Sequence, residues 1–216
     1  KSICMKGMNI LDIGANIGYY TTLFSKEAGN DGLVLAIEPD TESYKYLSKN
    51  ISSCKYKNVL SFPVAASDIR KKLPLFISKE NRGDNRLYKN NQKRDYIMVD
   101  CLTVDELLKE NKISSLDFIK IDVQGYEPKV FKGMQNIINS SKKLTLLTEF
   151  WPRGILQAGE NPKYFLTMLR KMRFELYELK QNGSLILLKH DKDNEFIEKY
   201  QGRRYTNIVG KKLTHK

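Results

Sequence analysis

Short apolar runs alternate with helical patterns along most of the chain, and this alternation constrains the fold more than any other feature. The runs that predict strands are residues 9–13, 33–38, 59–66, 116–123, 144–150 and 174–179. The patterns that predict helices are residues 19–28, 41–51, 103–109, 126–139 and 161–172. Alternation at this spacing is typical of βαβ units, which build a parallel sheet with helices on both faces. We therefore predict an α/β fold, a doubly wound and mostly parallel sheet in a single domain over residues 1–216, with its core at residues 9–180.

An irregular insertion separates the third and fourth predicted strands. Residues 73–78 and 96–99 are predicted to be short strands, and the polar, basic loop 79–95 joins them. The end of the chain allows two interpretations. Residues 184–188 follow an Asn182-Gly183 turn and can form a hairpin, or residues 205–209 can instead supply the last strand of the main sheet.

Charge and cysteine content restrict the partners and the compartment. The formal net charge is +12, which fits either a polyanionic partner or a solvated, Lys-rich surface. Cys4, Cys54 and Cys101 cannot all pair and lack metal-site spacing, which favours free thiols and a cytoplasmic location. No apolar run approaches the roughly 20 residues of a membrane span, so no membrane partner is expected. The first residues also lack the pattern of a signal peptide.

The first predicted strand runs into a glycine-containing turn, Asp12-Ile13-Gly14-Ala15-Asn16-Ile17-Gly18-Tyr19. Glycine lets the backbone approach a ligand, and the helix that follows presents free N–H groups. A dinucleotide fingerprint needs glycine where this chain has Asn16 and Tyr19, and the Gly-Lys-Ser/Thr of a Walker loop is absent. The turn therefore argues against a bound pyrophosphate.

S-adenosylmethionine contains no phosphate, and the polar residues around this turn fit it. Asp12 can orient the loop or meet the ammonium group, and Asn16 can donate to the methionine carboxylate. Glu38 ends the second strand, where a carboxylate bonds the ribose hydroxyls, and we expect it to be solvent-accessible without ligand. Taken singly, Asp12, Glu38 and Asp68 are also consistent with helix caps or turns. The predicted cofactor-binding residues are Asp12, Gly14, Ala15, Asn16, Gly18, Tyr19, Glu38, Pro39, Ala66, Ser67, Asp68 and Asp122.

Several motifs resemble the FkbM-type methyltransferases. They are the turn from Asp12 to Thr21, Glu38-Pro39, Leu102-Thr-Val-Asp105, and the run Lys120-Ile-Asp-Val-Gln-Gly-Tyr-Glu127. The resemblance covers roughly residues 9–150 and implies a class I, Rossmann-like methyltransferase that usually O-methylates small metabolites or sugars. The chain departs from the family at Gln124, where a glutamate is common, so no proton acceptor is expected there.

Methyl transfer is an in-line displacement, so the enzyme mainly aligns the acceptor and excludes water, and a hydroxyl acceptor gains from a nearby base. Asp122 ends the fourth strand and Glu149 the fifth, and both are predicted to be catalytic. Glu127 is interpreted as structural, with its carboxylate aimed back at backbone N–H groups. Asp122 and Glu149 lack an identifiable third ligand for a divalent cation, and no metal is predicted. His190 and His215 are interpreted as surface residues.

The acceptor is less constrained than the cofactor. Trp151-Pro152-Arg153 can wall an acceptor pocket, or Trp151 can pack in the core. Loop 79–95, with Tyr88, can grip an anionic acceptor or be a solvated loop. The leading hypothesis is O-methylation of a small-molecule or saccharide hydroxyl, with or without an anionic group. RNA ribose methylation is the alternative enzyme, and a degenerate S-adenosylmethionine-binding module is the non-enzymatic one. The intact Asp12, Asn16, Glu38 and Asp122 argue against the module.

Overall fold

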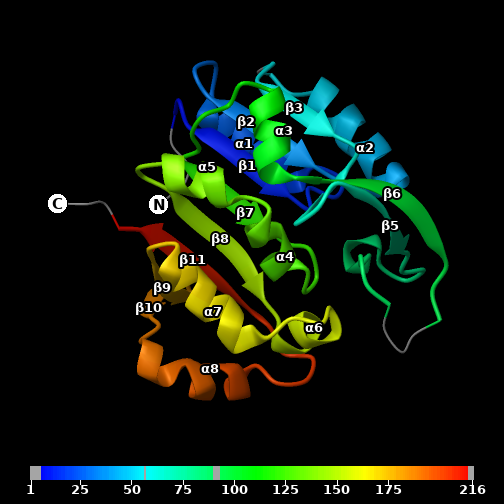
Figure 1. Cartoon of the computed structure of the whole chain (residues 1–216). Coiled ribbons are helices and arrows are strands. Elements are labelled where there is room, and N and C mark those ends of the chain that lie inside the picture. The colour runs from blue at the N-terminus through cyan, green and yellow to red at the C-terminus, as the bar shows by residue number, and fades with distance from the viewer. Residues whose placement is uncertain (1–5, 56, 90–92, 214–216) are drawn as a thin grey trace.

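The computed structural model describes residues 6–55, 57–89 and 93–213. Its main sheet has eight strands in the order β10-β9-β11-β8-β7-β1-β2-β3 (Figure 1). The strands are β1 (Asn9–Ile13), β2 (Leu33–Ile37), β3 (Val59–Phe62), β7 (Phe118–Ile121), β8 (Thr145–Phe150), β9 (Phe174–Leu179), β10 (Leu185–Leu187) and β11 (Thr206–Lys212). All four pairings among β1, β2, β3, β7 and β8 are parallel, which confirms the predicted α/β architecture.

Helices cover both faces of the main sheet, with α3, α4, α5 and α7 on the face nearer the viewer in Figure 1. The helices are α1 (Tyr19–Ala28), α2 (Thr41–Ser52), α3 (Val104–Glu110), α4 (Glu127–Lys132), α5 (Gln135–Ser140), α6 (Pro152–Gln157), α7 (Pro162–Lys171) and α8 (Asp193–Lys199). Successive strand residues point to opposite faces. Ile10 accordingly shares a buried cluster with Phe24 of α1, whereas Leu11 shares one with Leu107 of α3 and Phe165 of α7.

A second, three-stranded sheet holds β4 (Ala65–Ser67), β5 (Lys71–Phe76) and β6 (Tyr96–Thr103) in the order β4-β6-β5. The prediction of one strand over residues 59–66 is therefore wrong, because β3 and β4 belong to different sheets. Pro63 lies between them, and a proline has no N–H to donate to a ladder. Ala65 and Ala66 consequently pair with Cys101 and Leu102 of β6 and do not continue β3 beside β2.

The predicted helix over residues 126–139 is likewise two helices, α4 and α5, divided at Gly133. A Cβ at Gly133 would lie 2.0 Å from the carbonyl oxygen of Ser67, so the chain approaches β4 too closely there for any side chain. The Asp105 carboxylate caps the start of α5, because it accepts from the N–H groups of Asn136 and Ile137, both at 2.9 Å. The close contact of Gly133 with Ser67 and the hydrogen bonds from α5 to Asp105 together explain why one predicted helix is two.

Both interpretations of the end of the chain occur together. β10 pairs with β9 as the predicted hairpin, and β11 lies between β8 and β9, antiparallel to each. The helix predicted at residues 103–109 is confirmed as α3, and Thr103 and Glu106 form the reciprocal capping box at its start. Cys54 and Cys101 are free thiols, whereas Cys4 and His215 lie outside the described residues. None of the helices in the described part of the chain is long and apolar enough to span a membrane.

Candidate active site

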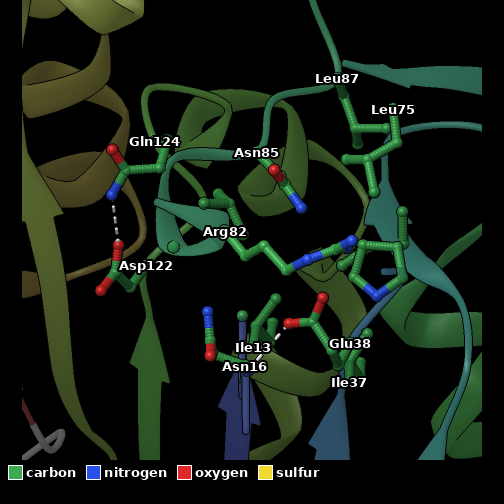
Figure 2. A pocket seen from close by; sticks show the side chains of 16 residues that line it. Ile13, Asn16, Ile37, Glu38, Leu75, Arg82, Asn85, Leu87, Asp122 and Gln124 are labelled. Carbon is green, nitrogen blue, oxygen red and sulfur yellow. Dashed lines mark hydrogen bonds between the residues drawn. The ribbon is translucent and has the colours of Figure 1, made fainter. Parts of the chain in front are cut away.

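A pocket opens at the carboxyl ends of β1, β2 and β7, where the chain order of the sheet reverses (Figure 2). Ligands of open α/β sheets bind at such a switch point. The space between its walls, open solvent at the mouth included, is about 640 Å³. Its walls come from the glycine turn, the Glu38-Pro39 corner, the turn after β7, and loop 79–95 with β5.

The glycine turn is held by contacts that leave no room for larger residues. Gly14 has φ 75°, and a Cβ there would lie 2.0 Å from the carbonyl oxygen of Asp122. Asn16 has φ 52°, in the left-handed region, and lines the pocket. Lys120 donates to the Gly14 carbonyl oxygen at 3.0 Å and lies 3.3 Å from the Asp12 carboxylate. Burial alone would lower the pKa of Lys120, but Asp12 and Asp122 raise it above its ordinary value.

Asp12 itself faces α1 and not the pocket. It lies on the same side of β1 as Ile10, and its Oδ2 accepts from the Thr21 hydroxyl at 2.6 Å. Its side chain is fully buried. Among the other predicted cofactor residues of this turn, Ala15 and Gly18 pack against α2 near Leu47, and Tyr19 is 70% exposed on α1. These three residues do not line the pocket.

Glu38 lies in the pocket wall with both carboxylate oxygens already bonded. Oε2 accepts from the Asn16 N–H at 2.8 Å, and Oε1 from the Asp40 N–H at 2.9 Å. The residue is only 7% exposed, so the expectation that it is solvent-accessible is wrong. The corner between β2 and α2 folds over it. Burial raises the pKa of Glu38 to about 7, although the two N–H donors oppose the rise.

Loop 79–95 closes the pocket from the opposite side. Arg82 reaches Asp40 with its Nη1 at 2.7 and 2.9 Å from the two carboxylate oxygens, and this pair joins the loop to α2. Asn85 lines the pocket, and its buried Nδ2 finds no hydrogen-bond partner among the residues that the structure describes. Leu75 and Leu87 add an apolar surface above it (Figure 2).

Arg86 and Tyr88 of this loop are packed into the protein, although most of its other described residues are exposed. Arg86 and Arg94 both lie 2.5 Å from the Asp84 carboxylate, and Arg86 and Tyr88 are less than a tenth exposed. Arg82 and Arg86 are paired with carboxylates, whereas Lys89 and Lys93 are exposed, so both roles proposed for the loop stay predictions. Of the three cofactor-binding residues predicted after the third strand, Ala66 lines the pocket. Ser67 and Asp68 contact Tyr126 and Lys129 instead.

A carboxylate pair with an amide between them stands where β7 and β8 end. The Gln124 amide nitrogen donates to Asp122 Oδ1 at 2.9 Å and to Glu149 Oε2 at 3.3 Å. Burial raises the pKa of Glu149, and the negative charge of Asp122 raises it further. The structural role predicted for Glu127 is confirmed, because its Oε1 accepts from the N–H groups of Val123 and Gly125.

A second, more open pocket of about 1320 Å³ lies on the other side of Gln124. Glu149, Trp151, Arg153, Arg203 and Tyr205 line it, and Gln124 and Gly83 line both pockets. Trp151 donates to the Gly202 carbonyl oxygen at 3.1 Å and carries the Arg86 guanidinium 4.8 Å above its ring. Trp151 therefore lines a pocket and is not enclosed in the core, and its role toward an acceptor stays a prediction. Among the described residues, no three His, Cys, Asp or Glu side chains are grouped as metal ligands.

Sequence reasoning missed several residues of this site. Lys120 carries a visible signal, because a lysine interrupts the apolar run of a strand predicted to be buried. Asn85 and Arg203 carry none, since nothing near them in the sequence indicates that they face a pocket. At Gln124 the sequence shows a departure from the family pattern, but it does not indicate that this residue joins two carboxylates.

The fold and this site together define a Rossmann-like class I methyltransferase. Residues 12–183 match the family described as the methyltransferase FkbM domain, so the chain belongs to the FkbM methyltransferase family. The match identifies an S-adenosylmethionine-dependent enzyme and confirms the resemblance seen in the motifs.

Similar proteins agree with this assignment. The hexuronic acid methyltransferase AglP of Haloferax volcanii is 23% identical over 199 residues, which cover 84% of this chain and 70% of AglP. The crystal structure of methyltransferase FkbM from Methylobacillus flagellatus KT matches with a TM-score of 0.55 and 16% identity. That match covers 94% of this chain but only 43% of the Methylobacillus chain.

The fibrillarin pre-rRNA processing protein of Methanococcus jannaschii matches with a TM-score of 0.54 and 15% identity, over 100% of this chain and 71% of that one. Likeness at such low identity shows the shared fold alone. The spread of functions among these relatives means that the acceptor must be argued from the site.

Proposed function

We propose that this methyltransferase O-methylates a hydroxyl group of a saccharide that carries a negative charge. The observation that carries the proposal is the meeting of two pockets at Gln124, directly beside the carboxylates of Asp122 and Glu149. One pocket suits the cofactor and the other the acceptor. A methyl donor and an acceptor must approach each other in line, and adjoining pockets allow this.

The residues of the first pocket fit S-adenosylmethionine. Glu38 offers a carboxylate for ribose hydroxyls. Asn85 offers a buried N–H donor that no other described residue accepts from, which suits an adenine ring nitrogen. Gly14 and Asn16 supply close backbone approach for the methionine part, and Pro39 and Leu87 an apolar surface. When bound, S-adenosylmethionine supplies an electrophilic methyl group. The fit of the donor set also accounts for why Asn85 tolerates an unpaired N–H.

The carboxylate pair supplies the acid–base chemistry. A neutral hydroxyl becomes a better nucleophile when a base accepts its proton. Asp122 lines the cofactor pocket, and we assign it as that base. Glu149 lines the acceptor pocket, and its raised pKa favours the protonated form, which donates a hydrogen bond to the acceptor. Gln124 can donate to both carboxylates whether or not Glu149 is ionised.

The second pocket has the features of a charged-sugar site. Trp151 and Tyr205 present aromatic surface, on which sugar rings pack. Arg153 and Arg203 are exposed and, among the described residues, have no carboxylate partner. Glu80 and Asp84 also line this pocket, but Asp84 is taken up by Arg86 and Arg94. AglP is named for methylation of a hexuronic acid, which supports an anionic sugar as the acceptor class.

A methyl-transfer assay tests the proposal. Radiolabelled S-adenosylmethionine is offered with a glucuronoside, the matching neutral glucoside and a glucose phosphate. We expect labelling of the charged sugars over the neutral one, and the paired replacement of Arg153 and Arg203 by glutamine should remove that preference. Equal labelling of the neutral glucoside would contradict the anionic part of the proposal, and labelling of none would contradict the saccharide.

Replacing Asp122 separates chemistry from binding. Asp122→Asn keeps the size and most hydrogen bonds, so the protein should fold and bind S-adenosylmethionine. Turnover should fall by ~10²–10⁴, because a general base typically contributes that much to the rate. Calorimetry and the transfer assay on the same preparation measure the two effects. If Glu149→Gln is inactive while Asp122→Asn is near wild type, the base is Glu149.

A further inference from the structure

In the turn after β7, Gln124 has an unusual backbone conformation. Gln124 has φ 56°, in the left-handed region that favours glycine, and Gly125 follows with φ 98°. A Cβ at Gly125 would lie 2.3 Å from the backbone of Gly154, so the turn is pressed against the start of α6. A residue with a Cβ is strained in this region, and the surrounding contacts must offset that strain.

Tyr88 supplies such a contact from a distant part of the chain. Its hydroxyl donates to the Gln124 carbonyl oxygen at 2.6 Å, and its ring is buried in the main hydrophobic cluster. Glu127 secures the neighbouring N–H groups of the same turn from the opposite side. The backbone of Gln124 is thus held from both loop 79–95 and α4.

This backbone conformation decides where the Gln124 amide points. The amide nitrogen reaches both Asp122 and Glu149, and Figure 2 shows the amide aimed at Asp122 along the edge of the cofactor pocket. A bond from an amide N–H to a carboxylate favours the ionised form, and it fixes the direction of the carboxylate. Displacing the amide would therefore change the position of both carboxylates and the protonation of Glu149.

We propose that Gln124 is a positioning residue for the carboxylate pair, and that the Tyr88 hydroxyl holds it in place from loop 79–95. The inference rests on the proposed function, because the carboxylates are the assigned acid–base groups. Tyr88 touches neither carboxylate and acts through the backbone of Gln124. Loop 79–95 would then set the geometry of the reaction as well as covering the cofactor pocket.

Three variants test the role of the pair. Tyr88→Phe removes only the hydroxyl, and Gln124→Gly removes the amide while keeping a residue that tolerates the left-handed backbone. Lys112→Gly is the matched control, because Lys112 also has a positive φ of 59° but lies exposed in the turn after α3. All three should melt within a few degrees of wild type.

The first measurement needs neither acceptor nor cofactor. The ¹³C carboxyl resonance of Glu149 is followed by NMR as a function of pH in glutamate-labelled protein. The charged groups around Glu149 are Asp122, Lys120, Glu127 and Asp84, and all are retained in these variants. Loss of a charge-assisted hydrogen bond of ~1.5–3 kcal/mol corresponds to about 1–2 pH units, so the midpoint should rise by that amount in Gln124→Gly. A smaller rise is expected in Tyr88→Phe, and none in Lys112→Gly.

The second measurement is kinetic. Displacing an aligned group costs up to ~10²-fold in rate, so kcat should fall roughly tenfold in Tyr88→Phe and further in Gln124→Gly. Glu149 acts in its protonated form, so the alkaline limb of the pH–rate profile should move upward with the Glu149 midpoint. The dissociation constant of S-adenosylmethionine should stay near the wild-type value. An unchanged Glu149 midpoint in both variants, or a loss of cofactor affinity as large as the loss of kcat, would overturn the proposal. If the wild type methylates no saccharide, the proposed function fails, but the NMR titration still decides the positioning role.

Discussion

Glu38 combines burial with two backbone hydrogen bonds, and these act on its charge in opposite directions. Burial disfavours the carboxylate and the N–H groups of Asn16 and Asp40 favour it, with a resulting pKa of about 7. A carboxyl whose folded pKa exceeds its unfolded value of 4.5 contributes stability below pH 4.5 that is lost as the pH rises through about 7. The same proton must leave before both carboxylate oxygens can accept from ribose hydroxyls.

Cofactor affinity should consequently depend on pH through Glu38. Below the pKa of about 7 the affinity for S-adenosylmethionine should fall by up to about tenfold per pH unit, and it should level off above pH 8. Glu38→Gln should bind about tenfold more weakly at pH 8 and lose this dependence, because one charge-assisted bond is gone. Calorimetry between pH 6 and pH 8.5 measures both effects. Glu42→Gln, an exposed neighbour on α2, is the control, and a pH dependence that survives in Glu38→Gln would refute the assignment.

At the scale of elements, a single carboxylate couples two helices that the sequence presents as unrelated. Asp105 lies in the first turn of α3, yet it accepts from the first N–H groups of α5. Free N–H groups at a helix start need such an acceptor. The motif that contains Asp105 therefore has a structural explanation, the placement of α5 after the break at Gly133.

Replacing Asp105 should affect stability and not the reaction. Asp105→Ala removes the cap of α5 and should lower the free energy of unfolding by ~1 kcal/mol, the usual contribution of an N-cap. Chemical denaturation of the folded enzyme measures the change, with Asp100→Ala as a control because the Asp100–Lys72 pair is exposed. Turnover and cofactor affinity should be unchanged, and a large loss of turnover at full stability would give Asp105 a functional role instead.

At the scale of the whole molecule, the chain has a net charge of +12, but many of its basic side chains already contact a carboxylate. Residues 70–94 hold nine Lys or Arg side chains, the densest basic stretch in the chain. Those with a carboxylate partner are Arg70, Lys72, Lys79, Arg82, Arg86 and Arg94. The Arg86 and Arg94 side chains are buried, and the other four form ion pairs at the surface, so nearby carboxylates offset much of the positive charge that a phosphate backbone would meet.

Binding to RNA should accordingly be weak and strongly dependent on salt. Fluorescence anisotropy with a structured RNA and a single-stranded RNA should show similar affinities at 50 mM salt, and both should be lost by about 200 mM, as expected of non-specific phosphate contacts. Neither RNA should compete with methylation of a charged sugar. Tight binding of one RNA that persists at 200 mM salt would favour ribose methylation over the sugar.

The sequence alone was enough for the features that depend on residues near each other along the chain. Strand and helix periodicity indicated the parallel sheet, the glycine turn and Glu38 indicated the cofactor, and Thr103 with Glu106 marked the start of α3. These features follow from backbone sterics and from hydrogen bonds within one turn, which a short segment contains completely.

Tertiary structure decided the features that depend on groups far apart along the chain. Arg82 pairs with Asp40 across 42 positions, and Tyr88 bonds Gln124 across 36. The burial of Glu38, the division of the helix at Gly133 and the bridge between Asp122 and Glu149 also needed the packed chain, because solvent exclusion and close backbone contact exist only after distant segments have met.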